Sequence, residues 1–344
     1  MRKTVFELCS LPGVSGRESA VRAYLQKKLK DAPAVREMRA DRMGNLIVEL
    51  RGKQRAPHKV LFAAHMDEVG GIVTGITDDG YLRFAAVGGI MPEVLFARRV
   101  FVNGHVGVIG GKATHQCKGD EKTKVPAIGT LGIDIGATSR AEAEEVVRIG
   151  DAVLFADGVT ELGGERFLAK ALDDRAGCAL LLMLAQTEPT YDVTIAFTVQ
   201  EEVGTRGAGC AAFAVQPEIA VAVDSTTASD ILGVPEEKQV CRVGGGAVVS
   251  FMDRATVYDK PLYDEIFRLA KVNGIAAQPK TCISGGNDAR SLQTAAEGAH
   301  VAAVSLPCRY IHSARCFLDE EDLRQTYRLL EAMMNTLPAW DGAV

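Results

Sequence analysis

Side chains that can bind metal ions or move protons recur where apolar segments of this chain end. Four apolar runs, at 59–64, 193–199, 219–223 and 300–306, each lead into such side chains, and a pair of aspartates precedes a helical segment. In an open α/β sheet, ligands bind outside the carboxyl ends of the strands. We therefore expect these side chains to form one site. They are His65, Asp67, Asp173, Asp174, Glu201, Glu202, Asp224 and His312.

Imidazole and carboxylate ligands without a cysteine thiolate suit Zn²⁺, Co²⁺ or Mn²⁺. A carboxylate shared by two cations about 3.5–4 Å apart builds a two-metal hydrolytic site, which also needs a general base. Of the neighbours Glu201 and Glu202, one can bind a metal ion while the other acts as the base, because adjacent side chains leave the chain in different directions. His65 and Asp67 are two residues apart, so they share one face of an extended segment and Asp67 can hold the far ring nitrogen of His65.

Each of these features alone has an ordinary structural explanation. A histidine after a strand is often a structural residue, and two aspartates before a helix usually cap it. A glutamate pair or an aspartate after a strand is common in a solvated turn. The arrival of five segments at one edge of the sheet is what favours a functional site.

The elements that must position these residues alternate between strands and helices. Strands are expected at 45–50 and at the four apolar runs. Helices are expected after the capping-box pair Ser15 and Glu18, after Asp173, and over 319–337. This alternation predicts an α/β fold whose mixed central sheet carries helices on both faces.

A different pattern occupies residues 71–156. Short segments rich in Val, Ile, Phe and Gly follow one another, interrupted by one helix with a capping-box pair, Ser139 and Glu142. This pattern predicts a small β-barrel or sandwich inserted into the chain. The 344 residues exceed the roughly 250–300 that one core accommodates. We therefore assign 1–70 and 164–344 to a discontinuous catalytic domain and 71–163 to the β-rich insert.

Composition excludes several classes of protein. Hydrophobic residues make up 47% of the chain, charged residues 24%, and the net charge is −5, which is typical of a soluble globular protein without the basic surface that nucleic acid requires. No run approaches the roughly 18 apolar residues of a membrane span, and the N-terminus lacks the apolar region of a secretory signal. Eight cysteines without a CxxC pair indicate reduced thiols. We expect a cytoplasmic protein.

The motifs together resemble those of the M42 family of metallo-aminopeptidases, which includes glutamyl and leucyl aminopeptidases and the tetrahedral aminopeptidases. They span nearly the whole chain, and their order and spacing carry the resemblance. The motifs are AHMDEVG (64–70), ALDDRAG (171–177), QEEVGTRGA (200–208), VAVDST (222–227), GGNDA (285–289) and RYIHS (309–313).

The resemblance implies two divalent metal ions per subunit, with Zn or Co expected and Mn also compatible. One ion would be held by His65 and Asp224, the other by Glu202 and His312, and Asp173 would bridge them. Two further roles are implied: Glu201 as the general base and Asp67 as the acid that orients a histidine. Asp174 is expected to cap the helix or to support a ligand.

The resemblance also implies that the protein removes N-terminal residues from short peptides. The insert would be a PDZ-like domain that mediates dimerisation, with a possible further assembly into a dodecamer, and it would serve assembly rather than chemistry. The chain departs from the family pattern at Ala314-Arg315-Cys316, where a proline usually follows the serine, and at Ala113-Thr114, where prolines usually precede His115.

Three alternatives stay open from the sequence. A dinuclear deacylase or dipeptidase would share the site and differ in how it recognises the ends of the substrate. A glycoside hydrolase needs two carboxylates about 5–10 Å apart and no metal ion, and it leaves the histidines without a role. A non-catalytic metal-binding or scaffold protein would also fit the ligands, although here every ligand and base position is filled.

Overall fold

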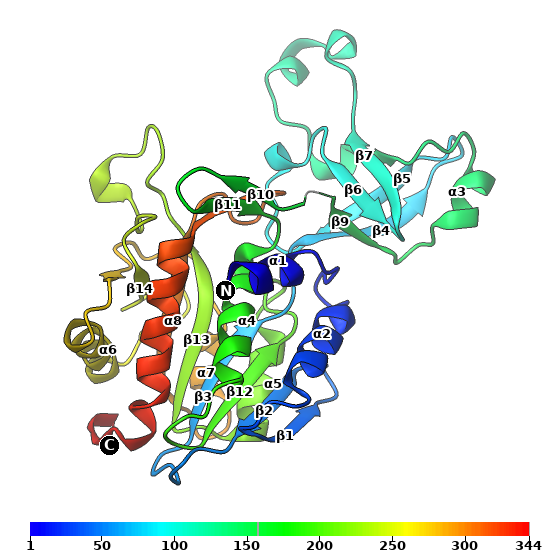
Figure 1. The fold of residues 1–344 in the computed structure, drawn as a ribbon. Coiled ribbons are helices and arrows are strands. Elements are labelled where there is room, and N and C mark those ends of the chain that lie inside the picture. The colour runs from blue at the N-terminus through cyan, green and yellow to red at the C-terminus, as the bar shows by residue number, and fades with distance from the viewer. Residues whose placement is uncertain (157, 344) are drawn as a thin grey trace.

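The protein is described by a computed structural model that covers residues 1–156 and 158–343. An eight-stranded mixed sheet forms its centre, and a closed six-stranded barrel lies beside it (Figure 1). The strands of the sheet run in the order β1-β2-β12-β3-β13-β16-β14-β15. Their bounds are β1 (Val35–Ala40), β2 (Leu46–Leu50), β3 (Val60–His65), β12 (Val193–Thr198), β13 (Ile219–Thr227), β14 (Ala247–Val249), β15 (Ala277–Pro279) and β16 (His300–Cys308).

The four central strands, β12, β3, β13 and β16, are parallel to one another, so their carboxyl ends lie at one edge. Antiparallel strands flank them, since β2 pairs with β12 and β14 pairs with β16. The central strands are buried on both faces, which explains why they read as continuous apolar runs. In β3, Phe62 faces one layer of helices and Leu61 the other.

Helices cover both faces of the sheet, as the sequence predicts (Figure 1). The larger layer consists of α1 (Arg2–Cys9), α2 (Ser19–Leu29), α4 (Leu172–Ala185), α6 (Lys260–Val272) and α8 (Glu320–Met334). The thinner layer consists of α5 (Arg206–Val215) and α7 (Ala289–Thr294). Its core is rich in alanine, because alanines of the sheet and of α5 let the helix backbone approach closely.

Three local predictions need correction. Ser15 does not cap a helix: α2 begins at Ser19, and the Ser15 hydroxyl donates instead to Asp67. Strand β13 continues past Val223 to Thr227, so Asp224 lies within the strand rather than after it. The edge strand β1 was not expected, because its exposed and half-buried residues lack an apolar pattern. At the second expected cap, Ser139 does accept a hydrogen bond from the Glu142 backbone N–H, at 3.3 Å.

The barrel has strand order β4-β5-β8-β7-β6-β9 and its own apolar core. Its elements are β4 (Gly70–Ile76), β5 (Leu82–Val87), β6 (Arg99–Val102), β7 (His105–Gly110), β8 (Gly132–Asp134), α3 (Arg140–Val146) and β9 (Ala152–Phe155). A separate three-stranded sheet joins β10 (Thr160–Leu162), β11 (Arg166–Ala169) and β17 (Cys316–Asp319). Within the described residues, no helix is both long and apolar enough to cross a membrane, and all eight cysteines are free thiols.

Candidate metal centre

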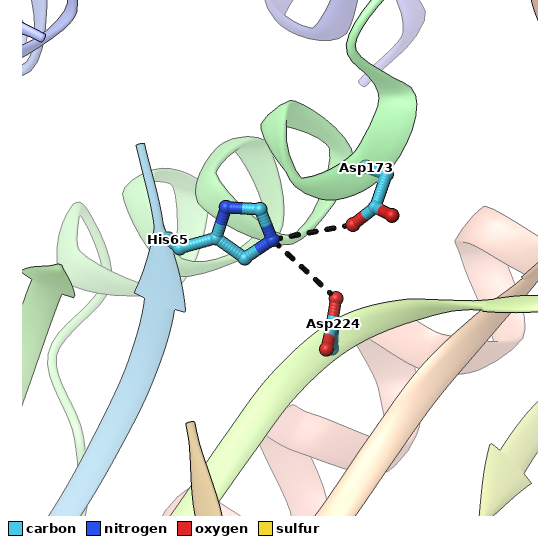
Figure 2. A group of neighbouring side chains, drawn as sticks. All are labelled: His65, Asp173 and Asp224. Atoms are coloured by element: carbon cyan, nitrogen blue, oxygen red, sulfur yellow. Dashed lines mark hydrogen bonds and ion pairs between the residues drawn. The ribbon is translucent and has the colours of Figure 1, made fainter. Parts of the chain in front are cut away.

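Three of the expected ligands converge at the carboxyl edge of the sheet. His65 ends β3, Asp224 lies in the neighbouring β13, and Asp173 stands in the first turn of α4. The His65 Nε2 atom lies 3.2 Å from Asp173 Oδ1 and 3.7 Å from Asp224 Oδ1 (Figure 2). One potential ligand atom from each residue lies within 4.8 Å of the others, close enough to surround a single cation.

A second group lies next to the first and shares one carboxylate with it. His312 Nε2 lies 3.4 Å from Asp173 Oδ2 and 3.4 Å from Glu202 Oε2. Asp173 therefore presents Oδ1 to one histidine and Oδ2 to the other. A carboxylate in this arrangement can bridge two cations.

A backbone carbonyl group that faces Nδ1 fixes the ring orientation of each histidine. Nδ1 of His65 lies 3.1 Å from the carbonyl oxygen of Asp67, and Nδ1 of His312 lies 3.0 Å from the carbonyl oxygen of Gly89. A carbonyl only accepts a hydrogen bond, so each neutral ring donates from Nδ1 and keeps the Nε2 lone pair for a ligand. With the carboxylates opposite both Nε2 atoms, the residues present fit Zn²⁺, Co²⁺ or Mn²⁺.

Gly89 belongs to the segment expected to serve assembly rather than chemistry. It follows β5 of the barrel, and its carbonyl is nevertheless the group that orients His312. The sequence expectation is wrong on this point, because the segment contributes directly to the site.

Asp67 organises the site more broadly than its spacing from His65 predicts. Its carboxylate lies 3.5 Å from His65 Nδ1, farther than its own carbonyl, and it accepts the backbone N–H groups of Glu201 and Glu202 at 3.0 and 3.2 Å. The Ser15 hydroxyl donates to the same carboxylate at 2.6 Å. Burial alone would raise the pKa of Asp67, but His65 and these hydrogen bonds outweigh it and hold the pKa below its ordinary value.

Buried charges fix the segment that carries His65 and Asp67. Glu68 accepts hydrogen bonds from Lys170 Nζ at 2.7 Å and Arg175 Nη2 at 3.3 Å. Arg175 also donates from Nε to the Met66 carbonyl at 2.7 Å. Because Arg175 lies in α4, these bonds tie the end of β3 to the helix that carries Asp173.

Two further carboxylates lie close to the ligands. Asp174 caps the regular part of α4 by accepting the Gly177 N–H at 3.0 Å, which is one of the roles left open for it. Asp288 accepts the Thr198 hydroxyl at 2.5 Å, while its other oxygen is buried without a hydrogen-bond partner. Burial raises the pKa of Asp288 to about 7. Sequence reasoning gave Asp288 no role, although it lies in the GGNDA motif.

The carboxylates of the centre are crowded into a buried space, which shifts their pKa values. Burial and the charge of Asp173 raise the pKa of Glu202 to about 8 and that of Asp224 to about 6. Burial also raises the pKa of Glu201 well above its ordinary value. Unfavourable charge of this kind is relieved when cations bind.

A cavity of about 400 Å³ opens beside both ligand groups. Glu201 lies in its wall with Asp173, Glu202, Asp224 and His312, so a substrate in the cavity would reach the ligands and the candidate base together. All seven predicted metal-binding and catalytic residues therefore lie at or behind this one cavity.

Metal affinity is expected to rise with pH at the His312 and Glu202 group. Burial lowers the pKa of His312, but Asp173 and Glu202 outweigh it and raise the pKa to about 10, while that of Glu202 is about 8. Without ions the pair holds at least one proton at pH 7, and a cation must displace it. The affinity for Co²⁺ or Zn²⁺, measured by chelator competition at pH 6, 7 and 8, should rise by a factor of about ten or more per pH unit. An affinity independent of pH would contradict the protonated state.

Comparisons with known proteins agree with this fold and identify the family. The model of the family described as M42 glutamyl aminopeptidase matches residues 44–329. A putative aminopeptidase of Acetivibrio thermocellus is 38% identical over 322 residues, which are 92% of this chain and 93% of that protein. The lysyl aminopeptidase of Pyrococcus furiosus is 35% identical, over 96% of this chain and 95% of the relative.

Among solved structures, the TET1 peptidase of Pyrococcus horikoshii, which can assemble into a tetrahedron or a large octahedral shell, has a TM-score of 0.85. It is 34% identical and covers 97% of this chain and 99% of its own. The family model and these relatives identify a peptide hydrolase of the exopeptidase class. Within that class, the chain belongs to the M42 family of aminopeptidases.

Proposed function

We propose that the protein is a dinuclear metal-dependent aminopeptidase that removes N-terminal residues from short peptides. The observation that carries this proposal is the shared carboxylate of Asp173, whose two oxygens face His65 and His312. His65 and Asp224 would hold one ion, Glu202 and His312 the other, and Zn²⁺ or Co²⁺ suits both sites, with Mn²⁺ also compatible. When bound, the ions supply positive charge that polarises the scissile carbonyl and makes a water molecule more acidic.

The remaining steps belong to the protein's own side chains. Glu201 would take a proton from the attacking water and pass it to the leaving amine. The Glu201 backbone N–H donates to Asp67. This hydrogen bond supports the role of Glu201, because it gives the backbone at Glu201 a defined orientation. The carboxylates around the cavity would bind the free amino group of the substrate, which restricts cleavage to the N-terminal residue.

The second part of the proposal concerns the barrel and its role in assembly. We propose that residues 71–163 form a PDZ-like insert in a catalytic domain of 1–70 and 164–344, and that the insert mediates a homodimer in a cytoplasmic protein. Its closed barrel and separate apolar core support an independent unit. Assembly of dimers into a dodecamer is proposed by analogy with the shells of the solved relative.

Chelation and rescue test the activity. The metal-loaded protein should hydrolyse aminoacyl-p-nitroanilides, lose this activity on treatment with a chelator, and regain it with Co²⁺ or Zn²⁺. Hydrolysis of N-acyl amino acids in place of the anilides would overturn the aminopeptidase proposal in favour of a deacylase. Activity on a glycoside that survives chelation would exclude a metal-dependent mechanism altogether.

A further inference from the structure

A buried lysine in the wall of the active-site cavity has no role in the mechanism above. Lys280 directly follows β15, lines the cavity with the metal-binding residues, and is only 5% exposed. Its backbone N–H donates to the Val249 carbonyl at 2.9 Å, and its Nζ donates to the Ser284 carbonyl at 2.8 Å. The side chain is therefore held in place from both ends.

Lys280 lacks the partner that a buried ammonium group usually has. In the ranges 1–156 and 158–343, no carboxylate oxygen lies within 4.0 Å of its Nζ. An ammonium group has three donors, and among the described residues the hydrogen-bond partner of Nζ is a neutral carbonyl, that of Ser284. Burying a charge is costly unless an opposite charge compensates it. The other buried lysine of the region, Lys170, has such a partner in Glu68.

A second basic residue lies in the wall of the same cavity. Arg290 also lines the cavity, and no carboxylate of the described residues lies within 4.0 Å of its guanidinium group. Several residues of the cavity wall are small or hydroxylated, including Thr227, Ser284 and Gly285, and they offer little apolar surface to a substrate side chain. The rest of a longer peptide must extend out of the cavity toward solvent. A buried cation therefore faces a part of the substrate that ends inside the cavity, such as the side chain of the N-terminal residue.

We infer that Lys280 binds the acidic side chain of an N-terminal glutamate or aspartate, with Arg290 adding positive charge in the same cavity. This inference rests on the proposed aminopeptidase function and names its substrate class. The comparisons leave that class open, because the family description names a glutamyl enzyme and one relative is a lysyl aminopeptidase. Lys280 is thus a specificity-determining residue.

The test compares wild-type protein with Lys280→Met on glutamyl-, leucyl- and lysyl-p-nitroanilides. Wild-type kcat/KM should be highest for the glutamyl substrate. Because a hydrogen bond to a charged group is lost, Lys280→Met should lower kcat/KM for the glutamyl substrate about 10–100-fold. The fold-reduction in kcat/KM for the leucyl substrate should be at least ten times smaller. Lys280→Glu should shift the preference toward the lysyl substrate. The matched control, Lys271→Met on the exposed part of α6, should leave all three values unchanged.

An equal loss on all three substrates would assign Lys280 a purely structural role and overturn the inference, as would a wild-type preference for leucyl or lysyl substrates. A loss seen only with dipeptides that have a free carboxyl end would show that Lys280 binds that end instead.

Calorimetry separates this inference from the proposed function, because it needs no turnover. The metal-loaded wild type should bind L-glutamate at least tenfold more tightly than L-leucine, and Lys280→Met should abolish the difference. Equal binding by the wild type would overturn the inference even if peptides are hydrolysed.

Discussion

Replacing Glu201 with glutamine should reduce kcat on an aminoacyl-anilide by about 10²–10⁴-fold while both metal ions stay bound. The substitution keeps the size of the side chain and removes its ability to take up a proton. Glu201 lies in the cavity wall and is not part of either ligand group, so the ligand set is left intact. Steady-state kinetics, together with metal analysis of the same sample, measure both parts of the expectation.

The neighbouring residue is a matched control for this variant. Glu202→Gln makes the same chemical change one position along the chain, where the carboxylate faces His312 at 3.4 Å. It should reduce the metal content as well as the activity. If Glu201→Gln retains wild-type kcat, or if it loses a metal ion as Glu202→Gln is expected to, the assignment of Glu201 as the general base is wrong.

Replacing Asp173 with asparagine should lower the metal content from two ions per subunit to at most one and reduce activity by about 10³-fold or more. In the wild type, the two oxygens of Asp173 face the two histidines. Asparagine has one oxygen and an NH₂ group that cannot bind a cation, so it cannot bridge two ions. Metal analysis after dialysis, followed by kinetics with excess Co²⁺, checks this result.

Asp174→Asn is the control for the bridging role. Its carboxylate is one residue away, but burial raises its pKa well above the ordinary value and one oxygen accepts the Gly177 N–H. Asparagine has the same size and keeps an oxygen for that bond. This variant should keep both ions and lose at most about tenfold in activity. Two retained ions in Asp173→Asn would contradict the bridge.

Several positions of the site could not be predicted from local sequence. His312, Ala171 and Gln200 have positive φ angles of 58°, 54° and 57°, which residues other than glycine rarely adopt. Each position is a predicted ligand itself or lies two residues before one. Contacts formed elsewhere in the fold must hold this backbone, because local preferences oppose it. The same limit explains Ser15, whose spacing to Glu18 predicts a helix cap but whose hydroxyl is recruited by Asp67, 52 residues away in the chain.

The sequence by itself determined the class of fold and indicated the edge of the sheet where the predicted ligands meet. Apolar runs such as 59–64 identify strands buried on both faces, and the parallel strands that result bring His65 and Asp224 to one edge. That inference needs only the periodicity of each segment and the rule that parallel strands share a carboxyl edge.

Only the tertiary structure decided how the ligands are oriented and what lines the cavity. The carbonyl of Gly89 behind His312 and the buried ammonium of Lys280 come from segments whose local patterns carry no sign of the site. The reason is physical: hydrogen-bond direction and the absence of an ion-pair partner depend on contacts between segments distant in the chain, and residue spacing contains no information about them.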